Sequence, residues 1–187
     1  MSDRETQLLD AAIDVLGTRG TRHLTHRAVD ARAGLPLGST SNRFRTRESL
    51  LAGVLGRILD REIAAWTTLG TVDPADRDGF TRSAGRLVRE LSTGGRVLTL
   101  ARHAIMVEAA AHPPLQRQIA DAQRRLIAWA APLVAALGSA DPERHLRLLL
   151  ALIDGLLTNQ LAHPDPEFDP ETAIATLLRG MLGRTAG

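Results

Sequence analysis

Six arginines lie between positions 22 and 47, and their side chains are suited to binding phosphate. They are Arg22, Arg27, Arg32, Arg43, Arg45 and Arg47, and Asp30 is the only acid in this stretch. A guanidinium can fork onto two phosphate oxygens or onto a guanine edge, so the cluster favours a polyanionic partner. A solvated arginine face would have the same composition, so the surrounding pattern must decide between the two.

A second group of polar residues lies inside this stretch, at positions 39–43. We expect Ser39, Ser41, Asn42 and Arg43 to face outward from a short helix, with Thr40 at the border. Short hydrogen-bonding groups beside one arginine fit the major groove of DNA, where bulky apolar groups would not. Taken singly, Ser and Thr near a helix start are ordinary caps or surface residues, so only the whole face argues for DNA.

Two short helices would position this face. Thr25 is expected to cap a helix that runs to about residue 33, where Gly34 supplies the positive φ of a sharp turn. Pro36 suits the first turn of a helix through about Phe44. Helices separated by three or four residues predict a helix-turn-helix.

Flanking helices would complete the helix-turn-helix domain, which we call the head. Ser2 followed by Glu5 fits a capping box for a first helix, whose apolar pattern stops at Gly17 and Gly20. Thr46 is expected to cap the helix that follows the head. Its first residue, Arg47, is disfavoured there by the helix dipole, so we expect it to bind phosphate and to have no structural role.

The rest of the chain reads as helical, which makes the protein all-α with about nine helices. Beyond a break at Gly70 and Asp73–Pro74, helices are expected near 80–91, 97–111, 114–137, 142–163 and 170–182. Asp141–Pro142 and Asp169–Pro170 each place a capping carboxylate before a first-turn proline. We divide the chain into a helix-turn-helix domain, residues 1–46, and an effector-binding and dimerisation domain, residues 47–187.

The last two helices carry more apolar surface than one subunit needs. On the first of them one stripe suits a core, while a second, largely nonpolar face lies roughly opposite. The residues expected at a two-fold dimer interface are Leu148, Leu152, Gly155, Asn159, Ile174, Leu177, Leu178 and Met181. Burial within one subunit is the alternative.

The candidates for an effector pocket are large or polar residues in the C-terminal part: Trp66, Phe80, His103, Val107, Trp129 and Asn159. Ordinary core packing is the alternative for each of them, because large apolar groups at helical spacing are usually core. The aromatic content of 3% favours an aliphatic or mixed-polarity effector over one held in an aromatic cage.

Composition argues against several other classes of protein. The absence of cysteine excludes disulfides, a thiol nucleophile and Cys-based metal sites. His103 and His112 would point to opposite faces of one helix, and Glu108 with His112 suits a surface pair, so we expect no metal, no cofactor and no enzyme. The acidic N-terminus and the lack of a run of about 18 apolar residues predict a cytoplasmic chain without a membrane segment.

Residues 5 to 55 resemble the TetR family of bacterial transcriptional regulators. The residues that carry the resemblance are Ala12, Arg19–Gly20, Leu24–Thr25, Arg27, Val29, Ala33–Gly34–Leu35, Gly38–Ser39, Phe44, Arg47–Glu48 and Leu50. The resemblance implies an all-α homodimer with two DNA-binding heads, a small-molecule pocket, and a repressor released by its effector. By position, it implies phosphate contacts from Thr25, Arg27, Thr46 and Arg47, base or sugar contacts from Ser39, Thr40, Ser41, Asn42 and Arg43, and either role for Arg45.

The chain departs from the family pattern at three places. The family often has Tyr where this chain has Ser41 and His or Tyr near Arg43, so the operator sequence cannot be carried over. Asp30 occupies a position that is usually small and neutral, and we expect it to face away from DNA or to pair with an arginine.

The leading hypothesis is therefore a sequence-specific regulator that binds a palindromic operator in double-stranded DNA as a homodimer and responds to an unidentified small molecule. A DNA-compacting helical protein without an effector and a helical enzyme with a basic patch remain alternatives. Protection of an inverted repeat would indicate the regulator, and salt-sensitive binding to any sequence would indicate the compacting protein.

Overall fold

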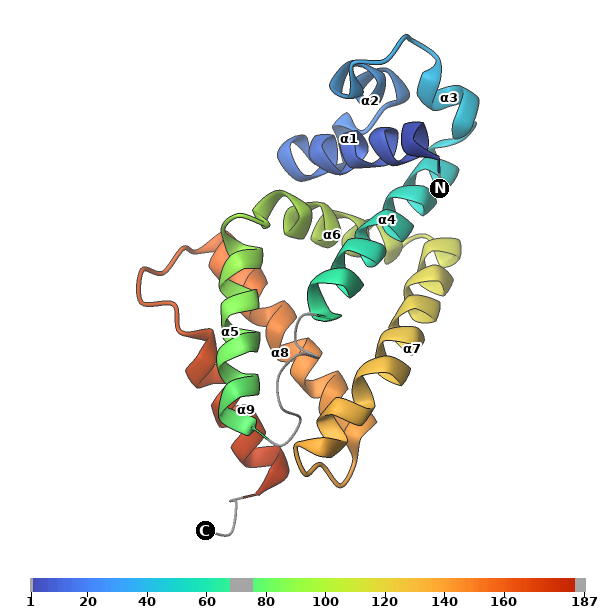
Figure 1. Cartoon of the computed structure of the whole chain (residues 1–187). Coiled ribbons are helices and arrows are strands. Elements are labelled where there is room, and N and C mark those ends of the chain that lie inside the picture. The colour runs from blue at the N-terminus through green and yellow to red at the C-terminus, as the bar shows by residue number, and fades with distance from the viewer. Residues whose placement is uncertain (1, 68–75, 184–187) are drawn as a thin grey trace. The chain divides into compact units, whose positions relative to one another are not determined.

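The computed structural model describes residues 2–67 and 76–183, except for the side chain of Trp66, and these residues form helices joined by turns (Figure 1). The all-α prediction is confirmed. The elements are α1 (Asp3–Arg19), the 3-10 helix η1 (Thr21–His23), α2 (His26–Ala33), α3 (Ser39–Arg43), α4 (Arg47–Thr67), α5 (Arg77–Ser92), α6 (Arg96–Ala109), α7 (Pro113–Ala136), α8 (Pro142–Ala162) and α9 (Pro170–Leu182). The break expected at Gly70 and Asp73–Pro74 lies outside the described residues.

Contacts divide the chain into two compact units. Unit 1 contains residues 1–62 and 95–122, and unit 2 contains residues 63–94 and 123–187. This division concerns packing alone, so the functional boundary after residue 46 stays a prediction. In the described ranges, no helix is long and apolar enough to cross a membrane.

Helix α1 is the centre of unit 1 and packs against both α2 and α6. Its buried residues are Leu8, Leu9, Ala11, Ala12, Ile13, Val15 and Leu16. The helix continues through Gly17 to Arg19 and ends at Gly20, whose φ is 79°. Gly17 is required for a different reason, because a Cβ at this position would overlap the main-chain carbonyl of Val97 on α6. The missing side chain lets two backbones approach closely.

Side-chain caps set the helix starts of unit 1 much as the sequence predicts. Thr25 Oγ1 accepts from the Ala28 amide at 3.2 Å, and Gly34 ends α2 with a φ of 65°. Thr46 Oγ1 accepts from the Ser49 amide at 3.0 Å, while Ser49 Oγ accepts from the Thr46 amide at 3.1 Å. These caps satisfy N–H groups that have no partner within the helix.

The start of α3 differs from the prediction. The expected helix over residues 36–44 is a five-residue helix, Ser39–Arg43, preceded by a turn in which Gly38 has a φ of 91°. The Ser39 amide donates to the Pro36 carbonyl at 3.1 Å, so Pro36 belongs to this turn. A left-handed residue cannot continue a right-handed helix, so the helix begins only after Gly38. Phe44, 7% exposed, anchors the far end in the core as expected.

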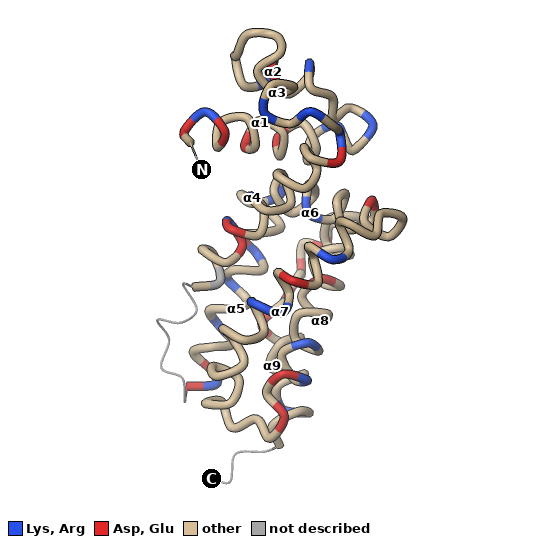
Figure 2. Tube along the Cα trace, turned by 90° about the vertical axis from the view of Figure 1, so that its right-hand side faces the viewer, with Lys and Arg blue, Asp and Glu red and all other residues tan. Residues whose placement is uncertain are grey.

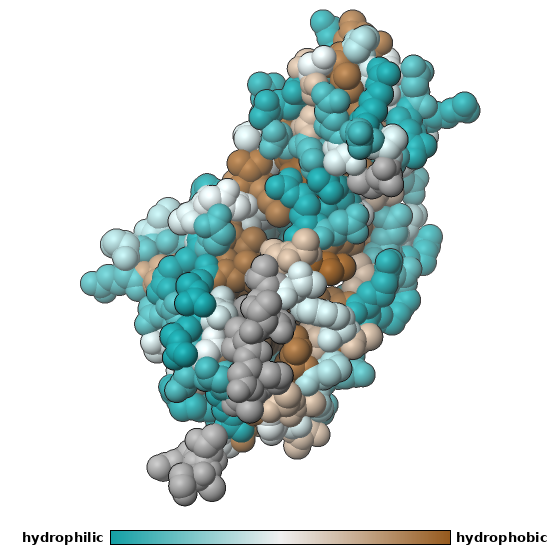
Figure 3. Space-filling model, in the orientation of Figure 1, coloured by the Kyte–Doolittle hydropathy of each residue, from teal (hydrophilic) through white to brown (hydrophobic). Residues whose placement is uncertain are grey.

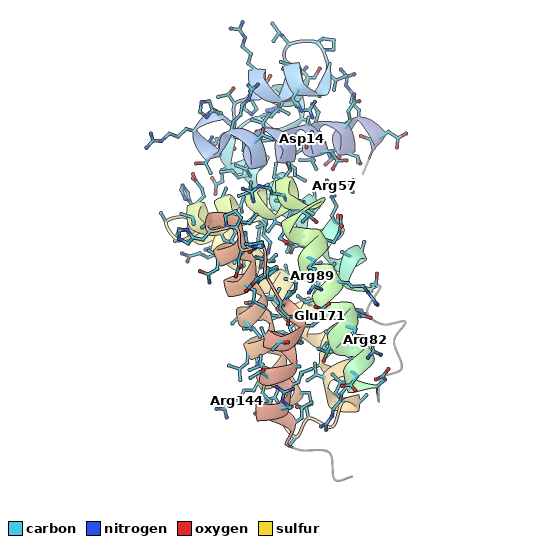
Figure 4. The ribbon with its side chains drawn as sticks, turned by 90° about the vertical axis from the view of Figure 1, so that its left-hand side faces the viewer. Asp14, Arg57, Arg82, Arg89, Arg144 and Glu171 are labelled. Atoms are coloured by element: carbon cyan, nitrogen blue, oxygen red, sulfur yellow. The ribbon has the colours of Figure 1, made fainter. Side chains whose placement is uncertain are left out.

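Unit 2 is held by apolar contacts among α5, α8 and α9, which lie side by side in Figure 1. Its core contains Phe80, Ala84, Val88, Leu137, Leu149, Ile153, Leu157, Ile174 and Leu178. The predicted caps are confirmed: Asp141 accepts from the Arg144 amide at 3.3 Å, and Asp169 from the Thr172 amide at 3.1 Å. Arg89 of α5 and Glu171 of α9 point toward each other and form an ion pair (Figure 4).

Candidate nucleic-acid interface

The turn between α2 and α3 is organised around the carboxylate of Asp30, which is 1% exposed. Its Oδ1 accepts hydrogen bonds from the Thr40 amide at 2.7 Å and from the Thr40 hydroxyl at 2.5 Å. Its Oδ2 accepts from the Gly38 amide at 2.8 Å. Asp30 is therefore buried in contact with the start of α3, and in this structure it binds the chain's own amides in place of an arginine.

These hydrogen bonds keep Asp30 ionised. Burial raises the pKa of the carboxyl. The hydrogen bonds from Thr40 and Gly38, aided by the nearby His26, lower the pKa by more than burial raises it, so the net pKa lies below the ordinary value. A buried charge is tolerated only when its oxygens are bonded, as they are here. The start of α3 thus depends on one carboxylate.

Thr40 does not belong to the outward face that the sequence predicted. Its side chain is 0% exposed, and its hydroxyl donates to Asp30. Ser39 is also largely covered, at 9% exposed, and its hydroxyl accepts from Arg4 Nη2 at 3.0 Å. A side chain bonded inward cannot reach a base edge without breaking that bond, so Thr40 is corrected from a DNA-contact candidate to a residue that holds α3.

Asn42 and Arg43 form the exposed end of α3, with Ser41 half-buried beside them. Arg43 Nη2 donates to Glu5 Oε2 on α1 at 2.6 Å. Between the two helices lies a depression of about 270 Å³, lined by Ser2, Arg4, Glu5, Leu8, Ser39, Asn42 and Arg43. The polar face of α3 is therefore continuous with the first turn of α1.

Arg47 has a structural role that we did not expect. Its Nη1 donates to the Leu24 carbonyl at 2.8 Å, and its Nη2 donates to the Thr21 carbonyl at 3.0 Å. Glu108 Oε1 on α6 lies 3.7 Å from the same Nη2. The helix dipole disfavours a cation at this position, but the long Arg47 side chain leaves its own helix and donates to carbonyl oxygens in the turn before α2.

The remaining candidates for phosphate contact are exposed. They are Thr25, Arg27, Arg45 and Thr46, and the two threonines also cap α2 and α4. Arginine positions recur along the trace from α2 through α3 (Figure 2), and mostly hydrophilic and neutral residues cover this end of unit 1 in the view of Figure 3. Arg32 forms an exposed ion pair with Asp14 at 2.6 Å.

The residues expected to form a dimer interface are only partly exposed. Ile174 and Leu178 are 0% and 3% exposed and pack in the core of unit 2 against residues of α5 and α8. The sequence analysis assigned both residues to the interface because the apolar pattern of α9 alone does not show that α5 covers them. Leu148 is 45% exposed, and Gly155 and Asn159 are exposed. Leu152, Leu177 and Met181 are partly exposed and also pack against the core of unit 2.

The effector candidates are distributed over both units. His103 and Val107 lie on α6 of unit 1, where the His103 ring nitrogen Nδ1 is 2.7 Å from the Thr99 carbonyl and Val107 is 76% exposed. Phe80 is buried in the core of unit 2, Trp129 is 38% exposed on α7, and the Asn159 amide donates to the Gly155 carbonyl at 2.9 Å. The Trp66 side chain lies outside the described residues. An effector role for these residues stays a prediction.

The described residues contain no cluster of three His, Asp or Glu that could hold a metal ion. The surface pair expected between Glu108 and His112 takes another form: His112 Nδ1 is 2.7 Å from the main-chain carbonyl of Glu108. The Glu108 carboxylate instead faces Arg47.

Comparison with known proteins decides the family. A family model described as "Tetracyclin repressor-like, C-terminal domain" matches residues 75–184. The chain belongs to the TetR family. No curated protein matches the sequence at a significant level. As a TetR-family member, the chain is a DNA-binding transcriptional regulator.

Solved structures agree with this TetR assignment. A TetR-family member from Streptomyces coelicolor A3 is 27% identical, with a TM-score of 0.77, and the match covers 98% of this chain and 100% of that one. The multidrug binding protein EbrR, in complex with ethidium, is 29% identical, with a TM-score of 0.70 and coverage of 95% and 97%. A transcriptional regulator from Rhodococcus sp. Rha1 shares the fold, with 24% identity, a TM-score of 0.79 and coverage of 97% and 96%.

Two residues beside the exposed end of α3 were not among the candidates that the sequence analysis named. Arg4 and Glu5 lie on α1, more than thirty positions before their partners Ser39 and Arg43. Pairing over that distance leaves no local spacing signal. The one available hint was a pair of charged residues in the first turn of a helix expected to flank the helix-turn-helix.

Proposed function

We propose that the chain is a homodimeric repressor that reads a palindromic operator with α3 and leaves it when a small molecule binds the C-terminal helices. The observation that carries the proposal is the exposed pair Asn42 and Arg43 at the end of a short helix whose start is held by Asp30. An amide and a guanidinium are the side chains that bind adenine and guanine edges in the major groove.

The proposed contacts fall into two groups. Ser41, Asn42 and Arg43 contact bases, whereas Ser39 and Thr40 are left out because their side chains are buried and hydrogen-bonded within unit 1. Thr25, Arg27, Arg45 and Thr46 contact the DNA backbone. Arg47 supports them by holding the turn before α2, and the exposed part of its guanidinium adds charge near phosphate.

The proposed dimer uses the outer surface of α8 and α9. Leu148, Leu152, Gly155 and Asn159 supply the α8 side, and Leu177 and Met181 supply the α9 side. Gly155 has open space around its missing Cβ, which allows a partner helix to approach closely. A two-fold arrangement matches the symmetry of a palindromic operator.

The likeness to EbrR, which was crystallised with ethidium, supports a small-molecule effector for this chain as well. Binding would act as a repressor switch if it stabilised a spacing of the two heads that misfits the operator. A coupling free energy of about 1 to 3 kcal/mol is enough to change operator occupancy.

The testing experiment selects bound sequences from a random double-stranded oligonucleotide pool with the full chain and then footprints the best sequence. We expect an enriched inverted repeat. Arg43→Ala should lower affinity for the repeat more than affinity for unrelated DNA, whereas Arg27→Ala should lower both and reduce the salt slope by about 0.9. Binding without any enriched sequence would point to a DNA-compacting protein and overturn the proposal.

A further inference from the structure

The first turn of α1 is bonded to the recognition helix at two places. Arg4 donates to Ser39, and Arg43 donates to Glu5, and all four residues line the depression between α1 and α3. We propose that Glu5 is a positioning residue for DNA specificity: it holds the Arg43 guanidinium in the orientation that binds one base and keeps it from pairing freely with phosphate. The inference rests on the proposed function.

Glu5 is the fixed member of this pair. Its side chain is 13% exposed, whereas that of Arg43 is 57% exposed. Leu8, one turn later on α1, lines the same depression and is 2% exposed, so the floor beneath Glu5 is packed. A long side chain held at one end by a covered carboxylate has fewer accessible rotamers. Arg43 therefore loses this conformational entropy when the protein folds and not when DNA binds.

The bond leaves Arg43 able to read a base. A guanidinium has five N–H donors in a rigid fork, and the bond to Glu5 uses Nη2. The remaining donors suffice for the two acceptors of a guanine edge. The planar fork transmits the orientation of one edge to the others, so fixing Nη2 fixes the direction of the whole group.

The ion pair between Arg43 and Glu5 is not explained by a contribution to folding stability. An ion pair with an exposed arginine contributes little to the free energy of unfolding. Local capping does not use the carboxylate either: Ser2 Oγ accepts from the Glu5 amide at 3.3 Å, and the carboxylate, expected from the sequence to complete a capping box, binds Arg43 instead. A carboxylate beside a DNA-binding face also repels phosphate, which weakens nonspecific binding most.

The test compares Glu5→Ala with Asp3→Ala in the full chain. Asp3 carries the same charge in the same first turn of α1 and forms no ion pair in the described structure, so it controls for charge and for the helix dipole. The measured quantity is the ratio of affinities for the selected operator and for the operator altered at the base that depends on Arg43. We expect Glu5→Ala to lower the ratio about fivefold, Glu5→Gln to lower it less, and Asp3→Ala to leave it unchanged.

Two further readouts separate positioning from a general effect on folding. In an Arg43→Ala background, Glu5→Ala should no longer change the ratio, because there is no guanidinium left to orient. With Arg43 present, Glu5→Ala should steepen the salt dependence of nonspecific binding by about 0.9, as the released arginine pairs with a phosphate. Thermal melting by circular dichroism should be nearly the same for all variants.

An unchanged ratio in Glu5→Ala would overturn the inference while leaving the proposed function intact, because the operator would still be selected. An equal fall in Asp3→Ala, or an equal fall without Arg43, would assign the effect to charge or to folding and overturn it too. If the unmodified chain enriched no sequence, both the proposed function and this inference would fail.

Discussion

Helix α3 and helix α9 are held in place by different forces. The start of α3 depends on three directional bonds, from the Thr40 amide and hydroxyl and from the Gly38 amide to Asp30. The position of α9 depends on apolar packing, with Ile174 and Leu178 buried against α5 and α8. One region is oriented by polar groups and the other by the shape of its core.

The difference follows from helix length and from function. A five-residue helix has little surface to bury, whereas the 13 residues of α9 provide a full apolar stripe. Apolar packing tolerates substitution by residues of similar volume, but a base-reading side chain must be placed accurately in angle. The orientation of α3 therefore depends on a few polar atoms, whereas the position of α9 does not.

The substitution with the largest expected effect is Asp30→Ala, which tests whether polar bonds hold α3 in place. The substitution leaves the amides of Gly38 and Thr40 and the Thr40 hydroxyl without their acceptor, and we expect a loss of about 3 kcal/mol in the local stability of the turn. Hydrogen exchange of peptides covering residues 34–46 measures it directly, and operator binding should be lost with it. Thr40→Ser, which keeps the hydroxyl, is the matched control. Unchanged exchange in Asp30→Ala would mean that packing alone holds α3.

The pH dependence of the same turn gives a second readout. Because the folded-state pKa of Asp30 lies below the ordinary value of about 3.9, its contribution is fully present above that value and is lost as the pH falls through the lower folded-state pKa. Exchange protection of residues 34–46 should therefore fall in the unmodified chain below about pH 4. Asp30→Ala should show no such step.

Substitutions at two glycines, one in each unit, should have effects of intermediate size and compare how tightly the two units are packed. A Cβ at Gly17 would overlap main-chain atoms of Val97, whereas a Cβ at Gly85 would overlap the side chain of Glu171. Backbone cannot move aside cheaply, so Gly17→Ala should destabilise the protein by about 2 kcal/mol. In Gly85→Ala, Glu171 can swing away, and the loss of its exposed ion pair with Arg89 is offset by better helix propensity.

Urea unfolding of both glycine variants measures the contrast, with Gly85→Ala expected within about 0.5 kcal/mol of the unmodified chain. Equal losses in the two variants would show that unit 2 is packed as rigidly as the junction of α1 and α6.

Local signals predicted much of this fold. The Asp–Pro pairs at 141–142 and 169–170 marked the starts of α8 and α9, and Thr25 and Gly34 marked the ends of α2. Each signal acts within one helical turn, so neighbouring residues suffice to read it. The start of α3 was placed too early because Pro36 is compatible with both a helix start and a turn, and the left-handed Gly38 decided the outcome.

The candidate site was predicted less completely because its contacts span long stretches of sequence. Glu5 reads as a capping residue and Arg47 as a phosphate ligand, yet their side chains reach Arg43 and the carbonyls of Thr21 and Leu24. Asp30 and Thr40 lie ten residues apart, and no local pattern links them until the turn brings them together. A long polar side chain has several possible partners, and only the folded chain selects one.

The smallest effect on the fold, and a decisive one for the dimer, is expected from Leu148→Arg. Leu148 is 45% exposed on α8, so an arginine there should leave the helical content of the subunit unchanged. If α8 and α9 pair across a two-fold axis, two copies of the new charge would face each other and the dimer should dissociate in sedimentation experiments. Leu37→Arg is the matched control, because Leu37 is 74% exposed in the turn between α2 and α3. A dimer that survives Leu148→Arg would place the interface elsewhere and leave the apolar surface of unit 2 without its proposed partner.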